Sequence, residues 1–177
     1  KYQRKLGADA WVVMPRYSND WINGRDIEVV HAGNTFMGGQ RFQYEVHKVS
    51  GDELGFPLYL VHVPGRLDRK GIYTDPDSGF GYWDEFERYL AFQIAAMEWI
   101  HTFKVYPDVL HCHDHHTALV PFMATSCPLF KGMEKIPTVI TIHNGEYHGN
   151  FDMDKARLLP EIYEGQHGFL DWGGRLN

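Results

Sequence analysis

Two short apolar runs, each followed at once by polar side chains, are the feature that most restricts the fold of this chain. Val109-Leu110 leads into the polar segment His111–His116, and the run Thr138–Ile142 leads into His143-Asn144. Both runs have the apolar, β-branched character of short buried strands. In an open parallel sheet, ligands bind in the crevice beyond the carboxyl ends of the strands. The sequence therefore predicts a polar pocket at two strand tips, suited to a sugar or a nucleotide.

The elements around these runs predict an α/β fold. The central order is strand, helix, strand, helix, strand, which is typical of a parallel sheet with right-handed crossovers. Gly38-Gly39 predicts a hairpin turn among the early strands. We therefore expect a Rossmann-like, mostly parallel sheet with helices on both faces and a β-hairpin extension. The expected strands are 10–14, 27–30, 42–46, 58–63, 109–112 and 138–142; the expected helices are 84–106, 115–126 and a short one within 153–163; segment 165–177 is expected to be loop.

Composition excludes several classes of partner. The formal charge is −6 and there is no basic run, which argues against nucleic acid. No apolar stretch approaches the roughly 20 residues of a membrane-spanning helix, so we expect no membrane partner. The two cysteines, Cys112 and Cys127, are interpreted as reduced, which favours the cytoplasm. Aromatic residues make up 15% of the chain, and tyrosine and tryptophan often line carbohydrate surfaces, although cores use them too.

The histidine-rich segment admits other interpretations. His111, His113 and Asp114 carry the imidazole and carboxylate groups that suit zinc or iron, so a metal-dependent hydrolase is one alternative. Asp114 also stands where the N-cap residue of the following helix is expected. His143, Asn144 and Gly145 could form a simple turn at a strand end. On spacing alone these alternatives stay open.

Five segments taken together resemble the bacterial glycogen synthase and plant starch synthase family. They occur in the family's order and cover most of the chain from about residue 6 onward. The motif that runs from His111 to Pro121 and the motif Thr141-Ile-His-Asn144 are specific as a pair. The five segments are 13–17, 68–73, 82–88, 107–121 and 136–144.

The resemblance implies a retaining glucosyltransferase of the GT-B type, with two Rossmann-like domains facing a cleft. Such enzymes transfer glucose from ADP-glucose, less often from UDP-glucose, to the non-reducing end of an α-1,4-glucan, and need neither metal nor cofactor. His143 corresponds to the family's histidine near the transferred glucose, and Asp114 to the aspartate beside sugar and acceptor. Tyr82 corresponds to the acceptor-side tyrosine. Asn144 and His113 share the motifs and are assigned supporting substrate-binding roles.

The chain departs from the family pattern in three ways. The resemblance implies that the family's K-x-G-G-L loop would precede residue 1 and that its C-terminal nucleotide domain would follow residue 177. Within the chain, His115 stands where the family has tryptophan. We therefore expect residues 1–177 to be a partial N-terminal catalytic domain without its first strand, and inactive by itself. The sheet edge that the missing first strand would leave unpaired could promote self-association. A non-catalytic glucan-binding module is the alternative.

Overall fold

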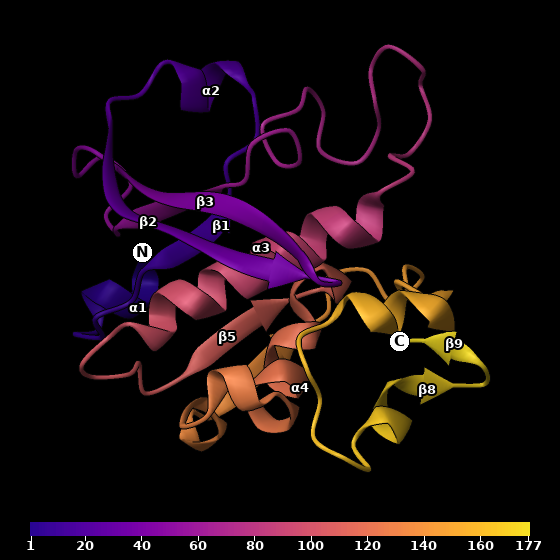
Figure 1. Cartoon of the computed structure of the whole chain (residues 1–177). Helices are drawn as coiled ribbons and strands as arrows, with labels where there is room; N and C mark the ends of the chain where they lie inside the picture. Colours follow the sequence, from indigo (N-terminus) through magenta and orange to yellow (C-terminus); the bar gives the residue numbers. More distant parts are fainter. The chain divides into compact units, whose positions relative to one another are not determined.

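The computed structural model describes all of residues 1–177, and the chain divides into two compact units. The first unit comprises residues 1–34 and 42–85, and the second comprises 35–41 and 86–177. Figure 1 shows the chain and labels many of the helices and strands of both units.

A four-stranded sheet with the order β1-β4-β3-β2 organises the first unit. Strand β1 (Val12–Pro15) runs parallel to β4 (Leu58–His62), which in turn pairs antiparallel with β3 (Gln40–Val49). Its core includes Val46, Leu60 and Val61, which are fully buried. Two short helices, α1 (Tyr2–Lys5) and α2 (Asp20–Asn23), flank β1 in sequence.

The predicted hairpin is confirmed and is longer than the sequence pattern indicated. Strand β2 (Ile27–Met37) neighbours β3, and only Gly38 and Gly39 separate them. Both glycines have positive φ, +56° and +76°, as the tight two-residue turns of β-hairpins require. The two long strands are drawn in violet in Figure 1.

A long buried helix and a parallel strand pair form the centre of the second unit. Helix α3 (Glu85–His101) begins one residue later than predicted and ends well before Pro107; its Leu90, Ile94 and Met97 are buried. Strands β5 (Leu110–His113) and β6 (Thr138–Thr141) pair in parallel. The predicted parallel arrangement of these two strands is thus confirmed.

The single helix predicted for residues 115–126 is wrong in its first part. A 3-10 turn, η1 (His115–Thr117), precedes helix α4 (Leu119–Ser126). Two further turns, η2 (Pro128–Phe130) and η3 (Met133–Lys135), lead to β6, and Met123, Phe130 and Met133 are fully buried there.

The C-terminal segment is more ordered than predicted. Strands β7 (Phe151–Asp152), β8 (Asp171–Trp172) and β9 (Arg175–Leu176) form a small antiparallel sheet in the order β7-β9-β8. The 3-10 turns η4 (Met153–Leu158) and η5 (His167–Leu170) complete it, and η4 matches the short helix expected there. The loop prediction for 165–177 is wrong because paired strands of two residues leave almost no periodic signal.

The structure also bears on the expectations about membrane-spanning helices and about the two cysteines. No helix combines the length and apolarity that crossing a bilayer requires. Cys112 and Cys127 are both buried and free, as expected. Burial raises the pKa of the Cys127 thiol to about 11, which keeps the thiol protonated at neutral pH.

Candidate functional site

The tips of β5 and β6 meet through Asp114, the residue that follows β5. The Oδ1 atom of Asp114 accepts a hydrogen bond of 2.7 Å from the backbone N–H of His143, which lies just beyond β6. The backbone N–H of Asp114 donates to the carbonyl oxygen of Thr141 at 2.9 Å. The parallel ladder therefore continues past the last paired residues. It places His113, Asp114 and His143 together at one edge, as the strand pattern predicted.

Asp114 holds an uncommon backbone conformation. Its φ of 55° and ψ of −176° make it the one non-glycine residue with positive φ. Such conformations cost about 1–3 kcal/mol each and are concentrated at functional sites. Although Asp114 stands at the N-cap position of η1, its side chain makes no capping bond, so the N-cap prediction is wrong. The carboxylate instead reaches the neighbouring strand.

Three imidazole rings line up along the strand tips. His113 Nδ1 lies 3.0 Å from His143 Nε2, and the two rings are nearly parallel, with centroids 5.3 Å apart. The His111 ring stacks on His113 at 4.4 Å, and its Nε2 lies 2.7 Å from the Thr141 hydroxyl. All three rings are exposed, whereas Cys112, between the first two, is buried. Strand alternation thus places the histidines on the open face.

The charges of this cluster are set by its own geometry. The backbone N–H of His143, followed by the imidazoles of His143 and His116, holds the pKa of Asp114 below its usual value. The carboxylate is therefore ionised at neutral pH. Burial, followed by the neighbouring His111 and His143, lowers the pKa of His113 below 6.5. The His113 ring is therefore predominantly neutral at pH 7, and one of its nitrogens is free to accept a hydrogen bond.

We expect the free energy of unfolding to fall as the pH drops below 6.5, and His113 to account for part of that fall. The folded-state pKa of His113 is depressed, so its contribution is complete above the ordinary value of 6.5 and is lost as the pH falls through the lower folded value. Urea unfolding over a series of pH values should show a shallower decline for His113→Gln. The matched control is the exposed His167→Gln; equal declines in both variants would contradict the assignment.

A cavity of about 550 Å³ opens beside the strand tips, within the second unit. Asp114 and Asn144 contribute polar groups to its wall, whereas His113 and His143 do not line it. Much of the remaining wall is aromatic or apolar, which suits the apolar face of a sugar ring. The wall includes the aromatic side chains of Phe86, Tyr89, Tyr147, Phe151 and Phe169.

His115, where the family resemblance leads one to expect tryptophan, also lines this cavity. Its ring centroid lies 6.0 Å from that of Tyr147 and 6.4 Å from that of Tyr89. Gly149 packs directly on it: a Cβ at position 149 would lie 2.4 Å from the His115 Cβ, and the φ of Gly149 is +63°. Only glycine fits that contact, so the chain closes tightly around the imidazole.

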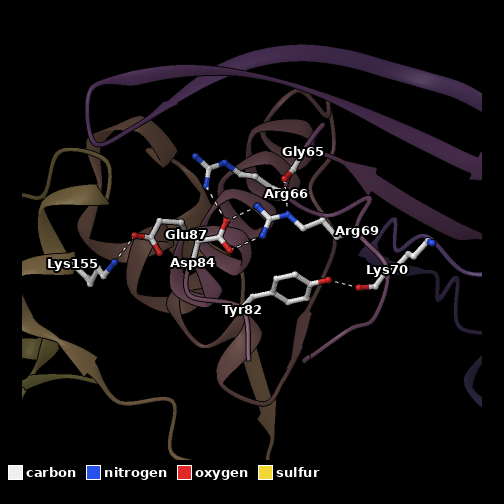
Figure 2. Close-up of polar contacts among 8 residues, drawn as sticks. All are labelled: Gly65, Arg66, Arg69, Lys70, Tyr82, Asp84, Glu87 and Lys155. Atoms are coloured by element: carbon white, nitrogen blue, oxygen red, sulfur yellow. Dashed lines mark hydrogen bonds and ion pairs between the residues drawn. The ribbon is translucent and has the colours of Figure 1, made fainter. Parts of the chain in front are cut away.

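Tyr82 lies in the first unit, whereas the other four predicted site residues lie in the second. Its hydroxyl donates a hydrogen bond to the carbonyl oxygen of Lys70, and the Arg69 guanidinium lies 5.2 Å from its ring centroid (Figure 2). Arg69 also donates two hydrogen bonds of 2.7 Å to the two carboxylate oxygens of Asp84. Sequence reasoning did not find this pairing, although both residues stand in segments that carry the family resemblance.

The metal-hydrolase alternative receives no geometric support. His111, His113 and Asp114 are not among the groups whose ligand atoms converge closely enough to hold an ion. The Oδ1 atom of Asp114 is committed to the backbone of the neighbouring strand. The arrangement instead offers an ionised carboxylate, a neutral imidazole and an amide at the edge of an aromatic cavity. Such groups are hydrogen-bond partners for sugar hydroxyls.

Comparison with known proteins gives a consistent family. The whole chain, residues 1–177, matches the model of the starch synthase catalytic domain. It is 40% identical over 177 residues to a glycogen synthase of Flavobacterium johnsoniae, covering 100% of this chain and 36% of the relative. A glycogen synthase of Streptococcus equi subsp. equi is 35% identical over 179 residues, covering 98% and 35%. The chain therefore spans about a third of the length of these relatives.

Among solved structures, the catalytic domain of starch synthase IV from Arabidopsis thaliana, bound to ADP and acarbose, shares the fold. The TM-score is 0.78 at 20% identity, and the match covers 99% of this chain and 36% of that one. The predicted α/β fold class is thereby confirmed.

Proposed function

We propose that this chain, which belongs to the starch synthase catalytic domain family, forms the part of a retaining glucosyltransferase that handles the transferred glucose and the glucan acceptor. The donor would be ADP-glucose or UDP-glucose, and the acceptor the non-reducing end of an α-1,4-glucan. Relatives named glycogen synthase, and a shared fold with a starch synthase bound to ADP and acarbose, support this choice.

In the proposed reaction, the bond between the glucose C1 and the diphosphate oxygen breaks, and a bond from C1 to an acceptor hydroxyl oxygen forms with retained configuration. The acceptor hydroxyl passes its proton to the departing diphosphate oxygen, and the nucleoside diphosphate leaves with the bonding electrons. Positive charge develops on the sugar ring during the transfer. Preorganised dipoles and anions aimed at that charge lower the barrier. An ionised Asp114 fits this requirement.

The roles of the remaining groups follow from their positions. His143 would orient the donor glucose through its ring and backbone, and need not donate a proton. His113 lies within hydrogen-bond distance of the His143 ring and would fix its orientation. Asn144, on the cavity wall, would bind a sugar hydroxyl. Tyr82 would contact the acceptor. The hydrogen bond between Asp114 Oδ1 and the His143 N–H is the single observation that carries this proposal, because it unites the two strand tips in one site.

The isolated 177-residue chain is expected to show no turnover of ADP-glucose with glycogen. We propose that it is a partial N-terminal domain, and that basic residues of a second domain would stabilise the leaving diphosphate. Assaying release of ADP from the isolated chain and from the full-length protein tests this. The full-length protein should release ADP. Release of ADP by the isolated chain would contradict the requirement for a second domain.

A non-catalytic glucan-binding module is the second candidate, favoured by the aromatic wall of the cavity. Glucan binding without turnover in the full-length protein would favour it. We also propose a cytoplasmic location, supported by the two free cysteines. Strand β1 is an edge strand of its sheet, and we propose that this edge allows self-association.

A further inference from the structure

A compact cluster of one carboxylate and two imidazoles lies in the first unit, in residues to which the proposed function assigns no role. Glu45, His47 and His62 each offer a ligand atom, and these atoms all lie within 4.8 Å of one another. His47 Nε2 is 2.7 Å from Glu45 Oε2, and His62 Nδ1 is 3.7 Å from the same oxygen. The two rings, with centroids 5.5 Å apart, therefore approach one carboxylate oxygen from two sides.

Strand geometry produces this convergence. Glu45 and His47 are two residues apart on β3, so their side chains leave the same face of the sheet. In the antiparallel register, Glu45 stands directly opposite His62 on β4. Side chains opposite each other on one face have Cβ atoms about 5 Å apart. Two rigid neighbouring strands thus fix all three groups before any ligand binds.

The cluster holds buried polar atoms that the protein leaves without partners. The His47 side chain is only 5% exposed and its Nδ1 has no hydrogen-bond partner. The His62 Nδ1, which faces Glu45, is also buried and has no hydrogen-bond partner. A buried polar atom without a partner costs about 1–3 kcal/mol, so such atoms are uncommon and call for an explanation. A ligand bound between His62 and Glu45 would satisfy one of them.

Asp68 gives His62 the support that a metal-binding histidine usually has. Its Oδ2 lies 3.4 Å from His62 Nε2, on the side of the ring away from Glu45. A carboxylate that accepts from one ring nitrogen fixes the tautomer and leaves the other nitrogen deprotonated for a metal. Here the nitrogen left for the ion is Nδ1, the one that points at Glu45.

We propose that Glu45, His47 and His62 form a binding site for a divalent transition-metal ion of the zinc type. Zn²⁺ prefers nitrogen and carboxylate oxygen ligands at about 2.0–2.2 Å, which places tetrahedral ligands about 3.3 Å apart. The separations of 2.7 and 3.7 Å from Glu45 Oε2 bracket that value. The ion would replace the proton shared by Glu45 and His47. Because the Glu45 side chain is 45% exposed, water can reach the site and fill the open position.

The bound ion would cross-link β3, β4 and, through Asp68, the loop that follows β4. The role is structural, because nothing in the proposed transfer reaction requires these residues. Two imidazoles also exclude Mg²⁺ as the preferred ion, since Mg²⁺ selects oxygen ligands. Binding of Zn²⁺ at this site does not depend on the proposed function. A Zn²⁺ titration could therefore succeed where the assay of glucosyl transfer fails, and it could fail where that assay succeeds.

Titration of the metal-free protein with Zn²⁺ by isothermal calorimetry tests the site. One equivalent of Zn²⁺ should bind, Mg²⁺ should not, and Zn²⁺ at a hundredfold excess over Kd should raise the Tm by roughly 5–10 °C. His62→Asn and Glu45→Gln, which change partly exposed side chains, should each weaken Zn²⁺ binding by about a hundredfold or more. Asp68→Asn, which only loosens His62, should weaken it about 10–100-fold.

Two controls keep the result specific. The exposed His167→Asn should bind Zn²⁺ like the unaltered protein, and circular dichroism should show that every variant is folded. Bound Co²⁺ gives a second readout, because its visible absorption reports nitrogen coordination directly and should disappear in His62→Asn. Zn²⁺ binding that persists in His62→Asn, or that is lost instead in His111→Asn, would overturn the proposal, as would failure of the protein to bind Zn²⁺ at all.

Discussion

Replacing His143 with alanine in the full-length protein is expected to lower kcat about 10²–10³-fold and to leave the fold intact. The magnitude is that of removing one preorganised group that stabilises charge in a transition state. The His143 side chain is exposed, and its main contact is the His113 ring, so its removal leaves no cavity in a core. The backbone N–H that Asp114 accepts from is retained in alanine. Initial rates of ADP release with ADP-glucose and glycogen measure the effect.

The outcome separates positioning of the sugar from general weakening of the protein. The free energy of unfolding of the variant should lie within about 0.5 kcal/mol of that of the unaltered protein, as is usual for surface substitutions. His167→Ala, another exposed histidine of the second unit, is the matched control and should retain full activity. Near-normal turnover by His143→Ala would contradict the role assigned to His143 in orienting the donor glucose. Asp114 would then be the residue to test next.

The parts of the fold that the sequence predicted are those coded by local pattern. The apolar runs that end in His111–His113 and in His143 predict strands, and parallel strands necessarily present their carboxyl ends at one edge. The Gly38-Gly39 pair predicts the hairpin because two successive positive φ angles suit glycine best. In these cases the neighbours in sequence are also the physical cause of the structure.

The parts that sequence reasoning missed depend on partners distant in sequence. A helix cap was one alternative for Asp114, but its carboxylate accepts a hydrogen bond from the backbone N–H of His143, 29 residues away. The cluster around Glu45 and His62 exists only because of the register between β3 and β4. No periodicity within one segment reveals a register, so such sites become visible only after the strands have been paired.

Removal of the Arg69 side chain is expected to cost about 3 kcal/mol in free energy of unfolding, the largest stability effect that we predict. Asp84, whose side chain is 2% exposed, accepts a hydrogen bond from Arg69 at each of its carboxylate oxygens. Breaking a buried ion pair by removing one partner typically costs about 3–5 kcal/mol, because an uncompensated charge remains buried. Arg69 is itself 26% exposed, and Arg66 stands 4.0 Å from Asp84, so the lower end of the range applies.

Urea unfolding of a short series of variants separates the charge from the geometry of this pair. Arg69→Ala should lose the full amount of about 3 kcal/mol in free energy of unfolding. Arg69→Lys keeps the positive charge but cannot form the two parallel hydrogen bonds, so its free energy of unfolding should fall by less. Arg69→Met combined with Asp84→Leu removes both charges and should recover much of the loss, because no buried carboxylate is then left unpaired. If the free energy of unfolding of Arg69→Ala lies within about 0.5 kcal/mol of that of the unaltered protein, Arg66 or water compensates the charge of Asp84. The ion pair between Arg69 and Asp84 is then not a principal stabilising contact. A loss that the double variant fails to recover would instead assign the effect to packing of the Arg69 side chain over the Tyr82 ring.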